Sequence, residues 1–470
     1  MNRANRRPRP AAGLKPLERP DARRPRYAAE PGLNRRVVLE ISRQKGEPSW
    51  MLAKRLRALE LYERTPLPAW GPDLGGLDLE RIVYFVRPGA EEASSWSDVP
   101  ADIRATFDRL GIPEAEHHSL SGAGAQYDSE VIYHNLKKEW ARSGVIFENM
   151  DVAVKKYPDL VKKYFMTDCV PASDHKFVML HAAVWSGGTF IYVPPGVRVG
   201  APLQAYFRMN AERGGQFEHT LIIADKGSRV EYIEGCSAPR YAASSLHAGC
   251  VELHIKEGAS VRYSSIENWS KNTYNLNTKR AVVDAGGSIE WLGGNLGSGV
   301  TMLYPMSVLR GEGARADSLG VVMAGPGQDI DVGMKVVHAA PRTVSTARSK
   351  SICRGGGIAT FRGLVRATAA AKEAKASVAC DALMLDAAST ANTYPTLRAD
   401  ADSVEIVHEA TVGRIGEEQI FYLTSRGLTT EQARKMIVNG FIDPVVKKLP
   451  LEYAVELNKL IDLEMTNTVG

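Results

Sequence analysis

One short pattern recurs through the middle of the chain and constrains its fold more than any other feature. It consists of a glycine, two residues, a small apolar residue, one further residue and then usually an aromatic or small one. The five copies begin at Gly196, Gly227, Gly258, Gly286 and Gly313. Their glycines are 31, 31, 28 and 27 residues apart. Because glycine accepts a positive φ at little steric cost, each copy predicts a tight corner.

Strand-like runs, such as residues 220–223 and 251–255, precede several of these corners. Strands joined by corners about every 30 residues favour a β-solenoid over a sandwich. We expect each repeat to form one turn of two or three strands. An antiparallel sheet with evenly spaced hairpins is the alternative, but no Asn-Gly or Asp-Gly hairpin turn recurs.

The composition of the 470 residues, 44% hydrophobic and 24% charged, is that of a globular chain with a large core. No run of 18 apolar residues predicts a membrane span, and the N-terminus lacks the apolar stretch of a secretory signal. Residues 1–36 hold eleven Arg and Lys but three Asp and Glu. The rest of the chain is therefore slightly acidic, which argues against a nucleic-acid groove.

Five cysteines are present, an odd count without any Cys-x-x-Cys pair. We therefore expect free thiols in a reducing cytoplasm and no zinc site built from one local knuckle. The chain also lacks a phosphate-binding loop, a Gly-x-Ser-x-Gly elbow and a His-Glu-x-x-His motif. We expect it not to hydrolyse ATP itself.

The sequence divides into four parts. Residues 1–30 predict a disordered basic tail, 31–170 an α-rich region, 171–405 the β core, and 406–470 a helical end that packs on the solenoid or binds a partner. The β character begins at Lys176, and the alanine-rich stretch 367–379 is expected to form strands and corners. The expected helices follow an Asn34 cap and Pro48, and span 102–110, 128–142, 157–165, 417–426, 430–439 and 451–465, with a strand at 84–86.

Cys236 lies where a strand is expected to stop, at Gly235, and such a thiol is open to a partner. Nearby cations raise the thiolate fraction of a cysteine, and Arg229 and Arg240 are its neighbours in sequence. The alternative, of about equal weight, is a small buried side chain at a corner.

Cys380, His408 and Glu409 combine a thiol, an imidazole and a carboxylate, a set that suits iron or zinc. Cys380 and His408 are 28 residues apart, close to one repeat, so they are expected on adjacent rungs about 4.8 Å apart. Glu409 has the opposite parity, so the strand must end or bulge at His408 for both to bind one ion. A purely structural cysteine and histidine are the alternative.

Several segments resemble the SufB/SufD family of the SUF iron–sulfur cluster assembly machinery, and within it the SufB type of subunit. The likeness covers about residues 31–470. The matching segments are 47–52, 65–68, 232–239, 267–269, 380–381, 405–409, 414–419 and 439–441.

The resemblance implies a right-handed parallel β-helix with helical ends. It implies a non-catalytic scaffold for iron–sulfur clusters that works in the cytoplasm with a SufD-type paralogue and a SufC-type ABC ATPase. A cysteine desulfurase with a sulfur shuttle supplies persulfide sulfur in such complexes. Reduced flavin is linked with the family, but no nucleotide motif supports it in this chain.

The resemblance also implies roles for residues. Cys236 corresponds to the sulfur acceptor, Cys380 to a ligand near the SufD interface, and His408 and Glu409 to further ligands. The helices within 414–441 correspond to the surface that binds SufC.

Arg208, Asn210, Trp269 and Lys279 match positions along the family's β-helix interior. By parity, either Arg208 and Asn210 or their neighbours at 207 and 209 point outward. Glu267 replaces a frequent glutamine, and a carboxylate facing the path would disfavour an anionic persulfide.

Two other hypotheses remain. One is a SufD-like subunit of the same complex, against which the long N-terminal helical region and residues 235–239 argue. The other is a β-helical enzyme acting on polysaccharides, which usually needs several carboxylates and aromatics on an outer face.

Overall fold

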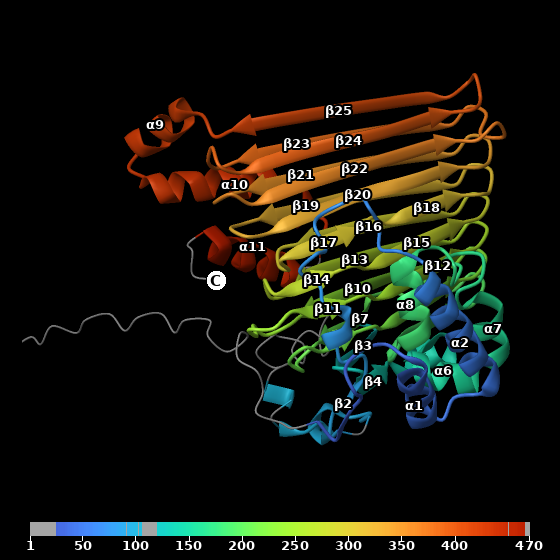
Figure 1. The fold of residues 1–470 in the computed structure, drawn as a ribbon. Coiled ribbons are helices and arrows are strands. Elements are labelled where there is room, and N and C mark those ends of the chain that lie inside the picture. The colour runs from blue at the N-terminus through green and yellow to red at the C-terminus, as the bar shows by residue number, and fades with distance from the viewer. Residues whose placement is uncertain (1–24, 91, 102, 106–119, 450, 466–470) are drawn as a thin grey trace, which may run out of the picture.

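The computed structural model describes residues 25–90, 92–101, 103–105, 120–449 and 451–465. Parallel strands coil through about eight turns, and helices lie toward both ends of the chain (Figure 1). The predicted fold class, a mainly β solenoid with helical flanks, is confirmed.

Two sheets form the walls of the solenoid. The first wall has ten strands: β3 (Gly122–Tyr127), β4 (Glu130–Leu136), β7 (Leu203–Arg208), β10 (Arg229–Ser237), β13 (Ser260–Asn268), β16 (Ser288–Asn295), β19 (Arg315–Ala324), β21 (Val344–Cys353), β23 (Lys375–Met384) and β25 (Glu405–Arg414). The second wall comprises β5 (Ile146–Asn149), β6 (Gly188–Val193), β8 (Gly215–Gln216), β9 (His219–Ala224), β11 (Ser245–His247), β12 (Cys250–Ile255), β14 (Thr273–Asn275), β15 (Thr278–Val283), β17 (Val300–Leu303), β18 (Met306–Leu309), β20 (Asp329–His338), β22 (Ile358–Ala367) and β24 (Thr390–Ala399).

The number of strands in a turn changes along the stack. In the early turns the second wall is divided, as in β11 with β12 and β14 with β15. From β20 onward each turn adds a single ten-residue strand to each wall. The prediction of two or three strands per turn is therefore confirmed, with both forms in one molecule.

The glycine corners stack one above another. All five predicted corner glycines have φ between +62° and +72°. The backbone N–H of Gly258 donates to the carbonyl of Ala285 in the next turn, 2.8 Å away, and the other four donate similarly. The stack continues at Arg342 and Glu373, with φ of +53° and +59°, where no glycine marks the corner in the sequence.

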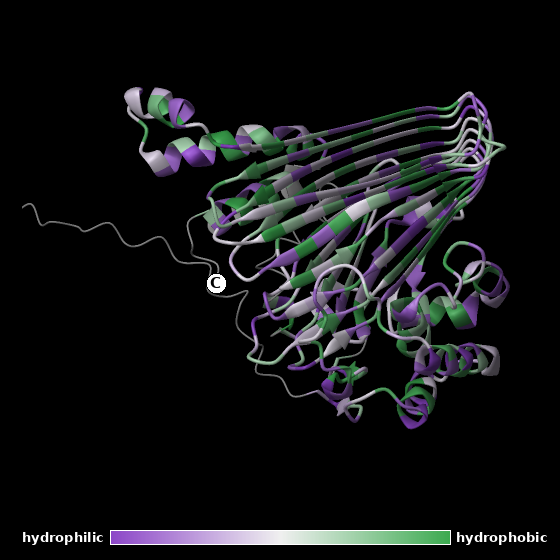
Figure 2. Ribbon diagram, turned by 45° about the horizontal axis from the view of Figure 1, so that its top comes forward, coloured by the Kyte–Doolittle hydropathy of each residue, from purple (hydrophilic) through white to green (hydrophobic). Residues whose placement is uncertain are grey.

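Alternation of side chains fills the interior and covers the walls, and Figure 2 shows apolar and polar residues mixed along each strand. The alanine-rich stretch forms strand and corner, as predicted. Ala371 and Ala374 are fully buried in the corner between β22 and β23, because only a small side chain fits there.

The N-terminal region adds helices beside the early turns (Figure 1). Asn34 caps α1 by accepting from the N–H of Val37, and the helices expected from Arg35, after Pro48 and at 157–165 are confirmed. The predicted helix 102–110 lies largely outside the described residues. The elements are β1 (Tyr27–Ala28), α1 (Arg35–Lys45), α2 (Ser49–Arg64), η1 (Leu79–Arg81), β2 (Val86–Arg87), η2 (Trp96–Asp98), α5 (Lys138–Arg142), α6 (Met150–Lys156), α7 (Pro158–Tyr164) and α8 (Lys176–Val184).

The helix predicted over 128–142 is wrong. Asp128 turns the chain with φ of +52° between antiparallel β3 and β4, and helix begins only at Lys138. Val131, Ile132 and Tyr133 are consecutive buried residues that favour a strand covered on both faces.

The β character expected from Lys176 is also wrong at its start, because Lys176–Val184 forms α8. Every residue from Phe177 to Val184 is buried. A helix buried on all sides has no polar stripe, so the sequence offers no helical period to detect.

At the other end, β25 extends the solenoid past Ile406, where helix was expected, to Arg414. Three helices follow: α9 (Glu417–Ser425), α10 (Thr430–Val446) and α11 (Leu451–Met465). The predicted stop of α10 at Gly440 is wrong, since Ile442 and Val445 continue the buried face. The helix α10 packs against β19 and β21, and Leu457 of α11 belongs to the same buried cluster as Ile233 and Ile266 of the first wall.

The boundaries at residues 30, 170 and 405 stay predictions. Most of the predicted tail lies outside the described residues, although Tyr27–Ala28 already pairs with β2. Within the described ranges, no helix combines the length and the apolar character needed to cross a bilayer.

Candidate functional site

Cys380 and His408 lie side by side on the last two strands of the first wall. Strands β23 and β25 run parallel, and His408 is in register with Val378, two residues before Cys380. Cys380 Sγ is 3.9 Å from His408 Nε2. A thiolate and an imidazole bound to one tetrahedral ion lie roughly 3.6 Å apart. The prediction that these residues occupy adjacent rungs is confirmed.

Glu409 does not join this pair. Strand β25 runs without a break or bulge from Glu405 to Arg414. Binding of one ion by both His408 and Glu409 required the strand to end or bulge at His408, and it does neither. His408 is half-buried, whereas Glu409 is exposed on the opposite face of the strand. The described chain thus brings two of the three predicted metal ligands together.

Cys236 lies within a strand, not at its end. Strand β10 continues to Ser237, and the thiol is buried in the solenoid interior beside Phe207. The expected exposure at a strand end is therefore wrong. Arg229 pairs with Glu231 at the solvent-exposed start of β10, so it is not the cation that faces this thiol.

A buried ionic network surrounds Cys236. Its Sγ lies 3.9 Å from Glu234 Oε1. Lys279 Nζ donates to Glu267 Oε1 at 2.8 Å and lies 3.6 Å from Glu234 Oε1. Tyr263 donates its hydroxyl proton to Glu234 Oε2 at 2.5 Å. These side chains are about 1% exposed, so the charges interact with little screening by water.

The network extends deeper through hydrogen bonds. Asn275 Nδ2 donates to Glu267 Oε2 at 2.5 Å, and Asn275 Oδ1 is 2.8 Å from His247 Nδ1. His247 Nε2 lies 2.5 Å from Glu218 Oε1. One connected polar chain therefore runs from Cys236 to Glu218 inside the solenoid.

A column of small residues links this network to Cys380. The column occupies one register position on successive strands of the first wall, and we name it the interior lane. Its members, in stacking order from Glu234 to Cys380, are Ser265, Gly293, Gly320 and Ser349.

The interior lane borders open space. A cavity of about 50 Å³ is lined by all four lane residues and by Lys279. A Cβ added at Gly293 or Gly320 would meet just one neighbouring atom within 4 Å, at 4.0 and 3.9 Å respectively. Five strand steps of about 4.8 Å separate Cys236 on β10 from Cys380 on β23, roughly 24 Å.

Comparison with known proteins assigns the chain to a family. The model "SUF system FeS cluster assembly, SufBD core domain" matches residues 207–441, and "SufBD protein N-terminal region" matches 124–205. Iron–sulfur cluster assembly SufBD family proteins of Staphylococcus epidermidis and Staphylococcus haemolyticus are each 50% identical over 444 residues, 94% of this chain and 95% of theirs. The chain belongs to the SufBD family.

The match to the SufBD core includes Cys236, Cys380, His408 and Glu409. Iron–sulfur cluster assembly is therefore the setting in which their chemistry is considered. Iron and sulfur are the cargo of such a protein rather than a resident cofactor.

In this SufBD protein the thiol of Cys236 is held in its neutral form. Burial raises the pKa of Cys236 well above its ordinary value, and the charges of Glu234 and Glu267 raise it further. Burial also raises the pKa of Cys380 to about 12, with Asp381 adding to the effect. Both thiols need a cation or a metal ion nearby to ionise at neutral pH.

At Cys236, burial and the charges of Glu234 and Glu267 outweigh the Lys279 charge, which lowers the pKa of the thiol. Lys279 itself is held as a cation. Burial opposes its charge, but Glu267 and Glu234 outweigh this and raise the pKa of Lys279 above its usual range. Burial would likewise raise the pKa of Glu267, but Lys279 and His247 lower it overall. The carboxylate of Glu267 is therefore held ionised in a direct ion pair with Lys279, but its charge still raises the pKa of Cys236, so its effect on a persulfide stays a prediction.

The other positions predicted to line the interior are all buried. Arg208 Nη1 donates to Ser237 Oγ at 3.1 Å, and the N–H of Asn210 donates to Asp128 Oδ1 at 2.6 Å. The ring of Trp269 lies 4.3 Å from that of His247. Phe207 and Met209 belong to the interior core, so Arg208, the next residue of β7, faces the opposite side of the wall and does not line the interior as expected. That side is covered as well, so neither pair is exposed.

Sequence reasoning missed Glu218, Glu234 and His247. The signal was present in part, because Glu234 and Cys236 share the parity of Tyr232 on β10. Polar residues at the inward positions of a strand mark a buried network. The partners from the second wall, such as His247, become apparent only once the two walls face each other.

Proposed function

We propose that this SufBD protein is a SufB-type scaffold for the assembly of iron–sulfur clusters in the cytoplasm. Cys236 accepts persulfide sulfur, and Cys380 and His408 hold sulfur and iron. The interior lane is the single observation that supports this most, because small side chains lead from Glu234, two residues from Cys236, to Cys380 and border a cavity on the way. The chain itself has a non-catalytic role and does not hydrolyse ATP.

Transfer of sulfur from a persulfide to a cysteine needs no oxidant. A thiolate attacks the outer sulfur of a persulfide, so one S–S bond breaks while another forms and the first thiolate is released. Within the network, Lys279 is the charge that favours an anionic sulfur species at Cys236, acting against burial and the carboxylates of Glu234 and Glu267. Reduction of the transferred sulfur to sulfide takes two electrons from an outside donor, for which reduced flavin stays a prediction.

The last turn of the solenoid offers a surface to a SufD-type paralogue. Strands β24 and β25 end the two walls, and exposed sheet edges favour pairing with another chain. Large apolar side chains are about half exposed on these strands: Tyr394, Leu397, Val407 and Val412. Glu409 joins the ligands if docking of this paralogue rearranges β25.

The helix α9 is the proposed binding element for a SufC-type ABC ATPase. It has no buried residue, and Phe421 and Tyr422 are 75% and 58% exposed. Apolar aromatics at this exposure favour a protein partner. A cysteine desulfurase with its sulfur shuttle is the proposed donor of sulfur.

Anaerobic reconstitution with iron and sulfide tests the ligand assignment. The protein should develop the visible absorption of an iron–sulfur cluster, and Cys380→Ala should abolish it. Cys353→Ala is the matched control, because Cys353 is a buried cysteine that lines neither the lane nor the Cys380 pair. Unchanged absorption in Cys380→Ala would refute the assignment.

A SufD-like subunit is the alternative within the family. It requires no sulfur acceptor at Cys236, so labelling of persulfide after incubation with a desulfurase and shuttle distinguishes the two. We expect labelling in the parent protein and its loss in Cys236→Ala. Membership in an assembly family leaves polysaccharide chemistry without support.

A further inference from the structure

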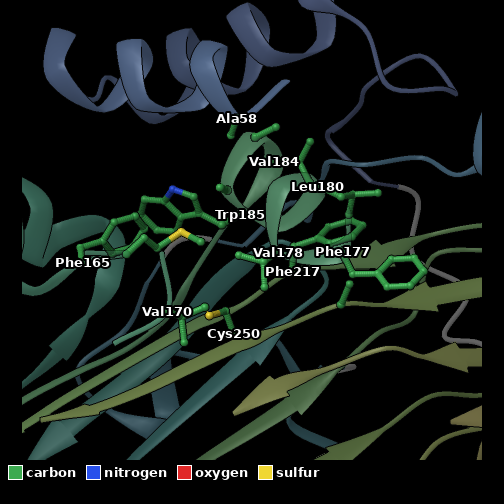
Figure 3. Packing of buried hydrophobic residues seen from close by; sticks show 14 of the residues in the cluster. Ala58, Phe165, Val170, Phe177, Val178, Leu180, Val184, Trp185, Phe217 and Cys250 are labelled. Carbon is green, nitrogen blue, oxygen red and sulfur yellow. The ribbon is translucent and has the colours of Figure 1, made fainter. Parts of the chain in front are cut away.

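A second cluster of metal-ligating side chains lies on the second wall, outside the interior and beneath α8. His181 comes from α8, His219 from β9 and Cys250 from β12, where Cys250 and His219 are register partners. One ligand atom from each lies within 4.8 Å of the others, and all three residues are buried. Figure 3 shows Cys250 on the sheet below α8, near Val178.

Each histidine is held from behind by an acceptor. His181 Nδ1 lies 2.9 Å from the carbonyl oxygen of Ala248. His219 Nε2 lies 3.2 Å from Glu252 Oε2, a close electrostatic contact that is off the N–H axis. Glu252 is fixed in turn by the N–H groups of Met166 and Val170, at 2.6 and 2.9 Å. Carboxylates and carbonyls behind histidine ligands are typical of metal sites.

This arrangement creates a conflict between lone pairs. A carbonyl oxygen only accepts, so His181 carries its proton on Nδ1 and turns a lone pair at Nε2 toward His219 Nδ1, 3.0 Å away. If His219 places its proton toward Glu252, two lone pairs face each other. If it places the proton toward His181, the unprotonated Nε2 lies 3.2 Å from the carboxylate, with no hydrogen bond between them. Only an additional cation, either a proton or a metal ion, relieves both arrangements.

We propose that His181 Nε2, His219 Nδ1 and Cys250 Sγ bind one divalent ion of the zinc class. Two nitrogens at 2.0–2.1 Å from a tetrahedral zinc ion lie roughly 3.3 Å apart, close to the spacing of these two atoms. With a thiolate at Cys250 and the carboxylate of Glu252 behind His219, the charges of the buried site sum to zero. A fourth position remains for a small ligand such as water.

The ion would pin α8 to the sheet, since its ligands come from that helix and from two adjacent strands of the wall. The neighbouring group of Cys169, Glu252 and His254 is a weaker choice. Cys169 Sγ approaches the carbonyl of Arg280 at 3.3 Å as a protonated thiol does, and both Glu252 oxygens accept backbone N–H groups.

The test uses the full chain in which the proposed iron and sulfur site at Cys380 is disabled. Cys380→Ala protein is produced with zinc in the medium, treated with a chelator while folded, and analysed for metal. We expect one zinc ion per chain, retained because the site is buried. Adding Cys250→Ser should reduce zinc to background, whereas adding Cys353→Ser should leave it unchanged. Equal zinc in the two double variants overturns the proposal.

X-ray absorption at the zinc edge provides a measurement that does not depend on the folding of a variant altered in the zinc site. On the Cys380→Ala protein it should show one sulfur and otherwise nitrogen or oxygen neighbours. Absence of zinc, or zinc without a sulfur neighbour, overturns the proposal, and the latter outcome denotes an adventitious ion only. Loss of cluster formation in Cys380→Ala with retained zinc separates this site from the proposed scaffold function.

Discussion

Cys380, at one end of the interior lane, and Cys236, two residues from Glu234 at the other end, lie in opposite environments. Cys236 lies in the early turns, within a connected network of carboxylates, histidine and a buried lysine, under helices that cover that part of the solenoid. Cys380 lies in the late turns, with small and apolar neighbours, and its one close polar partner among the described residues is His408 on the edge strand. The end at Cys236 is therefore enclosed by charged partners from this chain, whereas the end at Cys380 lies beside an exposed edge strand.

This difference concerns stability as well as function. We call the early turns around Cys236 the closed end and the last turn, with β24 and β25, the open end. Charges at the closed end depend on one another, so removing one leaves the others buried without a partner. At the open end β24 and β25 are exposed, and substitutions there change binding more than folding. The variants below separate these two regions.

The largest effect is expected for Lys279→Met. The variant leaves Glu234 and Glu267 buried without their cation, which typically costs about 3–5 kcal/mol in the free energy of unfolding. Chemical denaturation measures the loss. Lys226→Met is the control, since Lys226 forms an exposed ion pair with Glu257 worth at most about 1 kcal/mol. Equal losses in the two variants would contradict the proposed role of the network.

A pH dependence is expected from His338 in the late turns. Burial lowers its pKa from 6.5 to about 4. At pH values between these two, this histidine is protonated in the unfolded chain but not in the folded chain. Stability should fall as pH drops from 6.5 to 4, by up to about 3 kcal/mol. His338→Gln should flatten this part of the curve of denaturation midpoint against pH. If the slope of midpoint against pH were unchanged in His338→Gln, the loss of stability in acid would come from titratable groups at the closed end instead.

A smaller effect is expected at the corners. Gly286 has φ of +62° and open space around its missing Cβ, so Gly286→Ala should cost about 1–2 kcal/mol through backbone strain alone. Gly413→Ala is the matched control, with equal space but no positive φ. The denaturation midpoints of the two variants are compared. Similar midpoints would show that the positive φ of the corner glycines does not contribute to the stability of the fold.

The sequence predicted the solenoid because five corners require glycine, and it predicted the pairing of Cys380 with His408 because one repeat separates them. It failed where local signals were absent. Arg342 and Glu373 turn corners without glycine. The helix α8 is buried on every side and has no polar stripe.

The burial of Cys236 could not be predicted locally. Lys279, which pairs with Glu234 beside this thiol, is 43 residues from Cys236 and lies on the second wall, so the ion pair exists only after both walls form. The glycine and proline near Cys236 indicated a strand end, whereas the strand continues through Cys236 to Ser237. Partners across the interior, rather than neighbours in sequence, determine the state of this thiol.

Arrival of labelled sulfur at Cys380 is the most direct test of the interior lane. Persulfide is supplied by a desulfurase with its shuttle, and the peptide containing Cys380 is analysed for sulfane sulfur. We expect label on Cys380 in the parent and in Gly413→Val, and its loss in Cys236→Ala and in Gly320→Val, whose side chain fills open space in the lane. Undiminished label on Cys380 in folded Gly320→Val and Cys236→Ala would contradict transfer through the interior.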